Sequence, residues 1–179
     1  MATAQQLTDL RRHIRKLEPA GEFSEEYLTN LINIISVGAE ETVARITTIK
    51  TFNNDAALAD LTGLVTGNLA INSTYNVELL LRITSVGVVP GAEIKFVIPA
   101  GATLKWALGN PADVAGAELT EATEQNVATI AGTGLVTARG ILRTGGTVGT
   151  VKVQGAQNVA TVEDTSYEVD SQLVLTKIA

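Results

Sequence analysis

The first 40 residues carry apolar side chains at spacings of three and four, which is the period of an amphipathic helix. Thr3 is suited to cap a first helix, which Pro19 ends. Ser24 is suited to cap a second helix, which has Glu25 in its first turn and Gly38 at its end. The apolar faces of the two predicted helices consist of Leu7, Leu10, Ile14, Leu17, Leu28, Leu31, Ile32 and Ile35.

From about Arg45 onward, apolar and polar residues alternate, as they do in a half-buried β-strand. About eight short strands separated by turn signals predict a mainly β chain that folds as an antiparallel, jelly-roll-like β-sandwich. We therefore divide the sequence into a helical segment over residues 1–40 and a β-sandwich domain over residues 45–179. The stretch between them, AEETVAR, either extends the second helix or joins the sheet. The predicted strands lie in TTIKTF, ALADLTGLV, YNVELLLRITS, AEIKFVIPAG, ATLKWAL, LVTARGILRT, GTVKVQGAQ and SQLVLTKIA.

Proline and glycine mark the predicted turns. Pro90-Gly91 suits a type II turn, and Pro99 with Gly101 suits a type I turn. Gly145-Gly146 is suited to close a tight hairpin. Residues 109–125 are rich in acidic and small side chains, so we expect them to form a surface loop.

The alternation also predicts the core of the sandwich. At Leu173 and Leu175, the apolar run LVL leaves the register of the strand open by one residue. A shift of one residue would turn every side chain of the strand to the opposite face. We expect Trp106 in the core, with a sugar-stacking platform as the alternative. The predicted core side chains are Val77, Leu79, Leu81, Ile94, Phe96, Ile98, Trp106, Val151, Val153, Leu173 and Leu175.

Composition narrows the range of functions. The chain of 179 residues is 45% hydrophobic but only 4% aromatic, which indicates an aliphatic core. Its net charge of −6 argues against nucleic-acid binding, because neutralising phosphates requires a basic surface. There is no cysteine for a disulfide or a thiolate metal site. The N-terminus lacks the apolar stretch of a signal peptide, and no apolar run approaches the ~18 residues of a membrane span, so we expect no membrane partner and synthesis in a cytoplasm.

The sequence contains no pattern typical of a catalytic or metal-binding site. His13 is the single histidine, so a triad or a histidine metal site would lack its partner. Carboxylate pairs such as Glu163-Asp164 lie in polar stretches and are interpreted as solvated charge. The glycines of Gly132-x-Gly134 lie among predicted strands and lack the third glycine of a dinucleotide fingerprint. We therefore predict no catalytic residue, no cofactor and no metal, and a protein that is not an enzyme.

Motifs in two long stretches, residues 71–108 and 139–178, resemble the β-sandwich domains of tailed-bacteriophage virion proteins. The resemblance covers about residues 45–179 and is carried by YNVEL, by KFVIPAGA with the following Trp106, by RGILRTGGTVGTVKVQGAQN, and by the last strand SQLVLTKI. The sequence departs from that pattern at one position: the residue before Ala156 is often tryptophan in such proteins and is Gly155 here. This contact is therefore expected to be missing or to be filled by another side chain.

The resemblance implies a virion structural protein, since these sandwiches are similar to head fibres, capsid decoration proteins and tail-fibre modules, often trimeric. We hypothesise a capsid decoration (cement) or head-fibre protein, made in the host bacterial cytoplasm and located on the capsid surface of the virion. Its partners would be the major capsid protein or other virion proteins and two further copies of itself. The alternative is a tail-fibre or receptor-binding module that recognises host-surface glycans.

In the leading hypothesis, residues 1–40 attach the protein to the particle. Short isolated helices are marginal in water, so the two apolar faces must be buried against protein. The basic side chains of the first helix either dock on an acidic protein surface or form its solvated face. The proposed contact residues are Leu7, Leu10, Arg11, Arg12, Ile14, Arg15, Lys16, Leu28, Leu31, Ile32 and Ile35.

Overall fold

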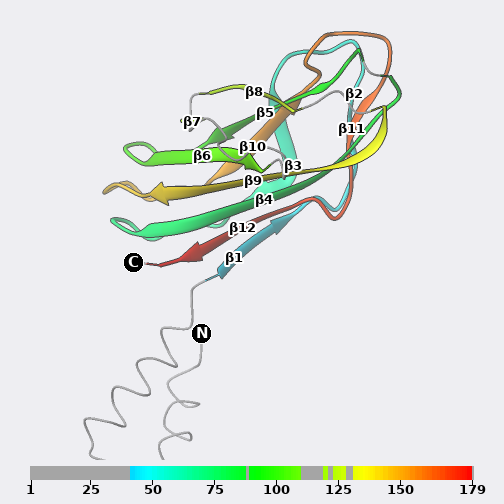
Figure 1. Ribbon diagram of the computed structural model, residues 1–179. Helices are drawn as coiled ribbons and strands as arrows, with labels where there is room; N and C mark the ends of the chain where they lie inside the picture. The colour runs from blue at the N-terminus through cyan, green and yellow to red at the C-terminus, as the bar shows by residue number, and fades with distance from the viewer. Residues whose placement is uncertain (1–40, 88, 110–118, 121–122, 128–130, 179) are drawn as a thin grey trace, which may run out of the picture. The chain divides into compact units, whose positions relative to one another are not determined.

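Two antiparallel β-sheets make up the part of the chain that the computed structural model describes, residues 41–87, 89–109, 119–120, 123–127 and 131–178 (Figure 1). No helix occurs among these residues. The two helices predicted over residues 1–40 lie outside them. The strands are β1 (Glu41–Arg45), β2 (Lys50–Phe52), β3 (Ala59–Val65), β4 (Thr74–Ser85), β5 (Ala92–Val97), β6 (Thr103–Gly109), β7 (Leu119–Thr120), β8 (Gln125–Val127), β9 (Gly132–Arg143), β10 (Lys152–Ala156), β11 (Thr165–Tyr167) and β12 (Gln172–Lys177).

The larger sheet has eight strands and is organised around the long strands β4 and β9. Its order is β1-β12-β4-β9-β6-β7, and β11 pairs with both β2 and β4. β4 pairs with β9 along its whole length, from Thr74 opposite Arg143 to Ser85 opposite Gly132. The smaller sheet has the order β3-β10-β5-β8. Figure 1 shows this smaller sheet above the plane of β4, β9 and β12.

Aromatic side chains join the two sheets face to face. Phe96 of β5 and Trp106 of β6 pack edge to face, with ring centroids 4.9 Å apart. The Tyr167 hydroxyl of β11 lies 2.6 Å from the carbonyl oxygen of Glu93 and 3.0 Å from that of Ala156, both in the smaller sheet. The described part of the chain is therefore a two-layer sandwich with its core between the layers.

The structure confirms the predicted core at ten of eleven positions. Ile98 is the exception, because it is partly buried and packs against the core from the end of β5. Leu173 and Leu175 are fully buried and lie opposite Leu79 and Val77 of β4. Because Leu79 and Val77 are themselves core residues, this pairing determines the register that the LVL run left open.

The described part of the stretch AEETVAR, residues 41–45, joins the sheet. Glu41–Arg45 forms β1 and pairs with β12, which places Ala44 opposite the core residue Leu173. A turn forms at Pro99 as predicted, since the backbone nitrogen of Ala102 donates a hydrogen bond to the carbonyl oxygen of Pro99. The predicted type I geometry is wrong, because Gly101 has a φ of 75°, which belongs to the third position of a type II turn.

The prediction of a hairpin at Gly145-Gly146 is wrong. β9 belongs to the larger sheet and β10 to the smaller one, so the segment between them crosses the sandwich. It pairs there with the chain that precedes β4: the backbone nitrogen of Thr144 donates to Ser73, and that of Val151 donates to the Thr66 hydroxyl. A Cβ atom on Gly145 would lie 2.6 Å from the carbonyl oxygen of Gly101, so glycine is needed for this close approach.

The prediction that residues 109–125 form one loop is wrong in part. Leu119–Thr120 pairs with β6, and β8 begins at Gln125 and pairs with β5. The buried indole of Trp106 explains the first pairing, because its Nε1 donates a hydrogen bond to the carbonyl oxygen of Thr120 at 2.9 Å. Residues 110–118 lie outside the described part.

Candidate functional site

The motif residues that resemble phage virion proteins serve the fold. Gln157, in the run QGAQN, is fully buried between two loops. Its Oε1 accepts hydrogen bonds from the backbone nitrogens of Asp55 and Thr161, and its Nε2 donates to the carbonyl oxygen of Glu163. A buried amide whose donor and acceptor groups are both paired stabilises the loops that it joins.

Tyr167 fills the space that Gly155 leaves. A Cβ atom at Gly155 would lie 2.6 Å from Tyr167 Cζ, so the tyrosine ring lies directly over the glycine. Tyr167 is fully buried and also packs edge to face with Phe52. Burial away from water raises the pKa of the Tyr167 hydroxyl, which therefore stays protonated and donates to the smaller sheet. The contact expected from a tryptophan at position 155 is thus made by another side chain.

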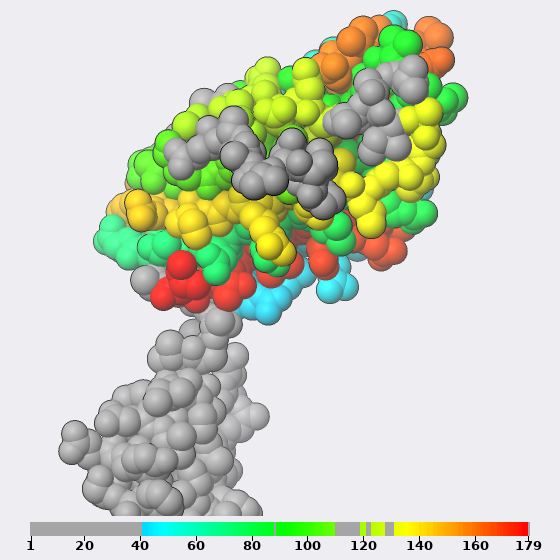
Figure 2. Space-filling view, viewed as in Figure 1, coloured from blue at the N-terminus to red at the C-terminus, as the bar shows by residue number. Residues whose placement is uncertain are grey.

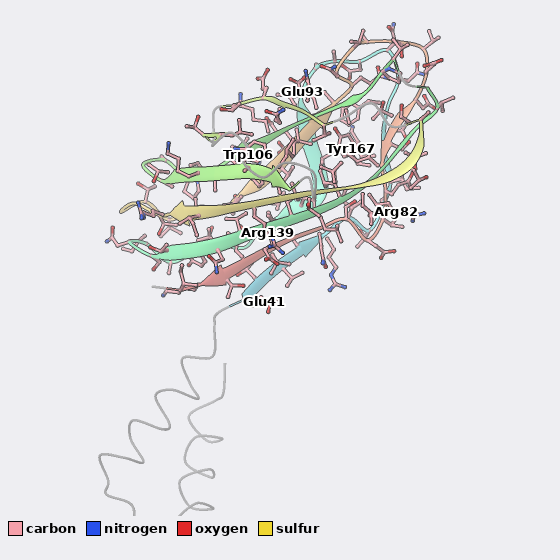
Figure 3. All side chains as sticks on the ribbon, in the orientation of Figure 1. Glu41, Arg82, Glu93, Trp106, Arg139 and Tyr167 are labelled. Atoms are coloured by element: carbon pink, nitrogen blue, oxygen red, sulfur yellow. The ribbon has the colours of Figure 1, made fainter. Side chains whose placement is uncertain are left out.

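Trp106 is a core residue. Its side chain is 2% exposed and lies between the sheets, as Figure 3 shows. The alternative of a sugar-stacking platform at Trp106 is therefore wrong, because a stacking ring must present its face to solvent.

The outer face of the eight-stranded sheet gathers most of the positive charge among the described residues. Outward-pointing side chains of β1, β12, β4, β9 and β6 alternate with the buried ones, and we call this surface the basic face. Arg82 and Arg139 project from it into solvent in Figure 3. The surface has a net charge of +3, although the whole chain carries −6. Its exposed charged residues are Arg45, Arg82, Lys105, Arg139 and Arg143, with Glu41 and Glu78.

An open groove of about 440 Å³ runs across the basic face between β12, β4 and β9. The half-buried side chains of Leu80 and Val174 are apolar parts of its lining. Arg139 Nε lies 3.5 Å from Glu78 Oε1 in the same groove, and both side chains are mostly exposed. An exposed pair of this kind contributes little to stability, so both charges remain available to a partner. In Figure 2, atoms of β9, β4, β12 and β1 form successive yellow, green, red and blue bands.

The outer face of the smaller sheet carries a different arrangement of charge. Asp60 of β3 accepts hydrogen bonds from Lys152 Nζ and Gln154 Nε2 of β10, each at 2.9 Å. These bonds hold the pKa of the Asp60 carboxyl below its usual value, chiefly through the bond from Lys152. Burial raises the pKa of Glu93 on the neighbouring strand, and the nearby Glu124 adds to this effect.

The lowered pKa of Asp60 predicts a dependence of stability on pH. The folded state binds the Asp60 proton more weakly than the unfolded state, so this contribution is fully present above the unfolded pKa of about 3.9 and is lost as the pH falls through the lower, folded pKa. Thermal unfolding at pH 7 and pH 3 should therefore show a smaller loss of Tm for Asp60→Asn than for the wild type. Lys152→Gln should reduce the loss in the same direction. A difference between wild type and Asp60→Asn that stays constant over this range would contradict the assignment.

The contact residues predicted from the sequence are not among those that form the basic face. All of them, from Leu7 to Ile35, lie outside the described residues, so the structure brings none of them together. The basic face was missed, although a signal for it exists in the sequence. Arg139 and Arg143 are four residues apart in a predicted strand, so their side chains lie on the same side of it. Lys105 directly precedes the core residue Trp106, so its side chain points away from the core.

No family model matches this sequence, and no curated protein matches it. The solved structures that match include the tripod from the baseplate of bacteriophage Tuc2009, with 11% identity over 98% of this chain and 93% of that chain and a TM-score of 0.34. A CocE/NonD family hydrolase from Staphylococcus aureus has 12% identity over 79% of this chain and 37% of its own, with a TM-score of 0.30. A structure of infectious bursal disease virus has 14% identity over 78% of this chain and 41% of its own, with a TM-score of 0.24. At these values the likenesses assign neither family nor function.

The prediction that the protein is not an enzyme is withdrawn, because the comparisons leave it unsupported: the matched structures include a hydrolase. At 12% identity and with 37% of the hydrolase covered, that match also gives this chain no activity. Among the described residues, no group of three or more histidine, aspartate or glutamate side chains is placed to hold a metal ion. No helix in the same part of the chain is long and apolar enough to span a membrane.

Proposed function

We propose that this protein is a structural component of a tailed-phage virion, a capsid decoration or head-fibre protein that presents its sandwich outward from the capsid surface. The observation that carries the proposal is the resemblance over residues 45–179. Three features of the described residues support it: the turn at Pro99, the buried amide of Gln157, and the replacement of the missing tryptophan contact by Tyr167. The motif residues thus act on folding, as motif residues shared by structural sandwiches would.

We propose further that the sandwich is a jelly roll. The strands β1-β12-β4-β9 lie opposite β3-β10-β5-β8, and β6 and β7 extend the first set beyond β9. Consecutive strands alternate between the two sheets at several points, as β9 and β10 do, which is the behaviour of a double Greek key. Such a fold pairs most strand edges internally and presents broad faces to partners.

The attachment segment in this proposal is residues 1–40. Its two apolar stripes would contact the major capsid protein or another virion protein, and the basic residues from Arg11 to Lys16 would face acidic side chains on that partner. Three sister copies would raise the effective concentration of the anchors, so weak binding by each copy suffices.

Deletion of residues 1–40 tests this role. The remaining fragment is expected to keep its β-type circular dichroism spectrum and a cooperative melt, because the described core residues all lie between Ala44 and Leu175. It should no longer sediment with particles that lack the protein, whereas the full chain should bind them. The control is the full chain with Arg11, Arg12, Arg15 and Lys16 changed to glutamine, which separates the contribution of charge from that of the apolar stripes.

The other outcomes decide against this assignment. A fragment that aggregates would show that residues 1–40 close the core. A fragment that still binds particles would show that attachment lies on the sandwich itself. Labelling at the tail tip of the particle, with none at the head, would favour the alternative receptor-binding module.

A further inference from the structure

Three loops meet at one end of the sandwich, which we call the valine end. They are the loops between β2 and β3, between β4 and β5, and between β10 and β11. Backbone hydrogen bonds connect the loops. The nitrogen of Val86 donates to the carbonyl oxygen of Asp164, that of Val159 to the carbonyl oxygen of Pro90, and that of Asn54 to the carbonyl oxygen of Thr161. Figure 2 shows the orange and green atoms of two of these loops side by side at the upper right. The loops therefore form one surface.

The valine end is apolar and acidic. Its four valines are unusually exposed: Val86 at 71%, Val89 at 56%, Val159 at 48% and Val162 at 80%. The three loop sequences, NNDAAL, VGVVPG and QNVATVED, contain neither lysine nor arginine. Of their three carboxylates, Asp55 is exposed, whereas Asp164, bonded to Asn53 Nδ2, and Glu163, with a buried Oε2, are half-buried. Exposed apolar side chains gathered into one patch are typical of an interaction site, and here the partner must also tolerate or attract negative charge.

The basic face has the complementary character. It carries a net charge of +3 and exposes Leu135 at 68%, Val43 at 43% and Ile141 at 38%. Its groove is partly lined by Leu80 and Val174, which offer apolar surface below the rim. An exposed valine from another molecule could remove its methyl groups from water there, while the exposed carboxylate of Asp55 approaches the arginines.

We propose that the protein self-associates by docking the valine end of one copy onto the basic face of the next. The two surfaces differ, so the contact is heterologous: each copy uses its end toward one neighbour and its face toward the other. Such a contact forms a closed ring when the rotation between copies closes, and a trimer is the smallest common ring. The inference concerns the purified protein and does not depend on its place in a virion.

Sedimentation of the full-length protein tests the self-association. Over about 1–100 μM protein, the mean mass should rise with concentration at about 0.02 M salt and fall at about 0.5 M salt, where the charge pairs are screened. Arg139→Glu with Arg143→Glu on the basic face should weaken association by about tenfold or more. Val86→Ser with Val162→Ser at the valine end should weaken it by a similar factor. The matched control is Lys95→Glu with Lys152→Glu, which makes the same change in charge on the other sheet. It removes the surface ion pairs with Glu124 and Asp60. This variant should associate as the wild type does.

Mixing the two defective variants distinguishes a heterologous contact from a symmetric one. The basic-face variant keeps an intact valine end, and the valine-end variant keeps an intact basic face. An equimolar mixture should therefore form a one-to-one dimer that does not grow further, although neither variant associates alone. Circular dichroism spectra like that of the wild type show that the variants are folded.

Three results would overturn the proposal. The first is a wild-type protein that stays monomeric at the highest concentration in low salt. The second is association that persists unchanged in either defective variant, which would place the contact elsewhere, for example in residues 1–40. The third is a mixture of the two variants that stays monomeric, which would show that the two surfaces do not bind each other.

Discussion

Replacing Phe96 with alanine is expected to lower the free energy of unfolding by about 3–5 kcal/mol, because it removes a buried ring and leaves a cavity in the core. Phe96 is 2% exposed and packs edge to face against Trp106 of the opposite sheet. The side chain therefore joins the two layers as well as filling volume. Equilibrium unfolding in urea, followed by circular dichroism, measures the change.

The neighbouring Val97 is the matched control for Phe96. It lies on the same strand with its side chain on the outer face, where it is 36% exposed. Val97→Ala should change the free energy of unfolding by no more than about 0.5 kcal/mol. Equal effects of the two substitutions would mean that the assignment of inward and outward positions in β5 is incorrect.

Replacing Gly155 with alanine is expected to lower the free energy of unfolding by about 1–3 kcal/mol through overpacking. The added Cβ atom would lie 2.6 Å from Tyr167 Cζ, and the tyrosine cannot move freely because its hydroxyl is bonded to the smaller sheet. Thermal or urea unfolding gives the size of the effect. Gly146→Ala is the control, since a Cβ atom at that position has no neighbour within 4 Å.

A second substitution at Tyr167 tests whether the cost at Gly155 comes from this contact. Tyr167→Leu is destabilising alone, because it removes a buried ring and its hydrogen bonds. In that background, however, Gly155→Ala should cost less than about 0.5 kcal/mol, because the clashing ring is gone. Additive losses in the double variant would show that the strain at Gly155 arises elsewhere.

The period-two alternation was sufficient to predict the core side chains. In YNVELLLRITS, the alternate positions from Tyr75 to Ile83 are all buried, because one face of β4 packs on the smaller sheet and the other faces solvent. The same parity places Arg139 and Arg143 outward on β9. The alternation of residues therefore predicts which side of a strand is buried. It also predicts which charged residues form the basic face.

Strand partners could not be predicted from local pattern. Gly145-Gly146 allows the chain to turn but does not say whether it returns to the same sheet, and here it crosses to the other one. The strand Leu119–Thr120 is too short to show an alternation of residues. Its pairing with β6 is explained by the buried Trp106 indole, which donates a hydrogen bond to the carbonyl oxygen of Thr120. The valine end depends on three loops that are distant in sequence, so its apolar patch exists only in the folded chain.

Cryo-electron microscopy of tailed particles from the cells that encode this chain tests the proposed role on the head of the virion. We expect density for the two-sheet sandwich on the outer surface of the head, with the end of β1 that carries Glu41 directed toward the particle. We also expect contact between neighbouring copies through the valine end and the basic face. A reconstruction in which other chains account for all the density of head and tail would contradict the proposed virion role.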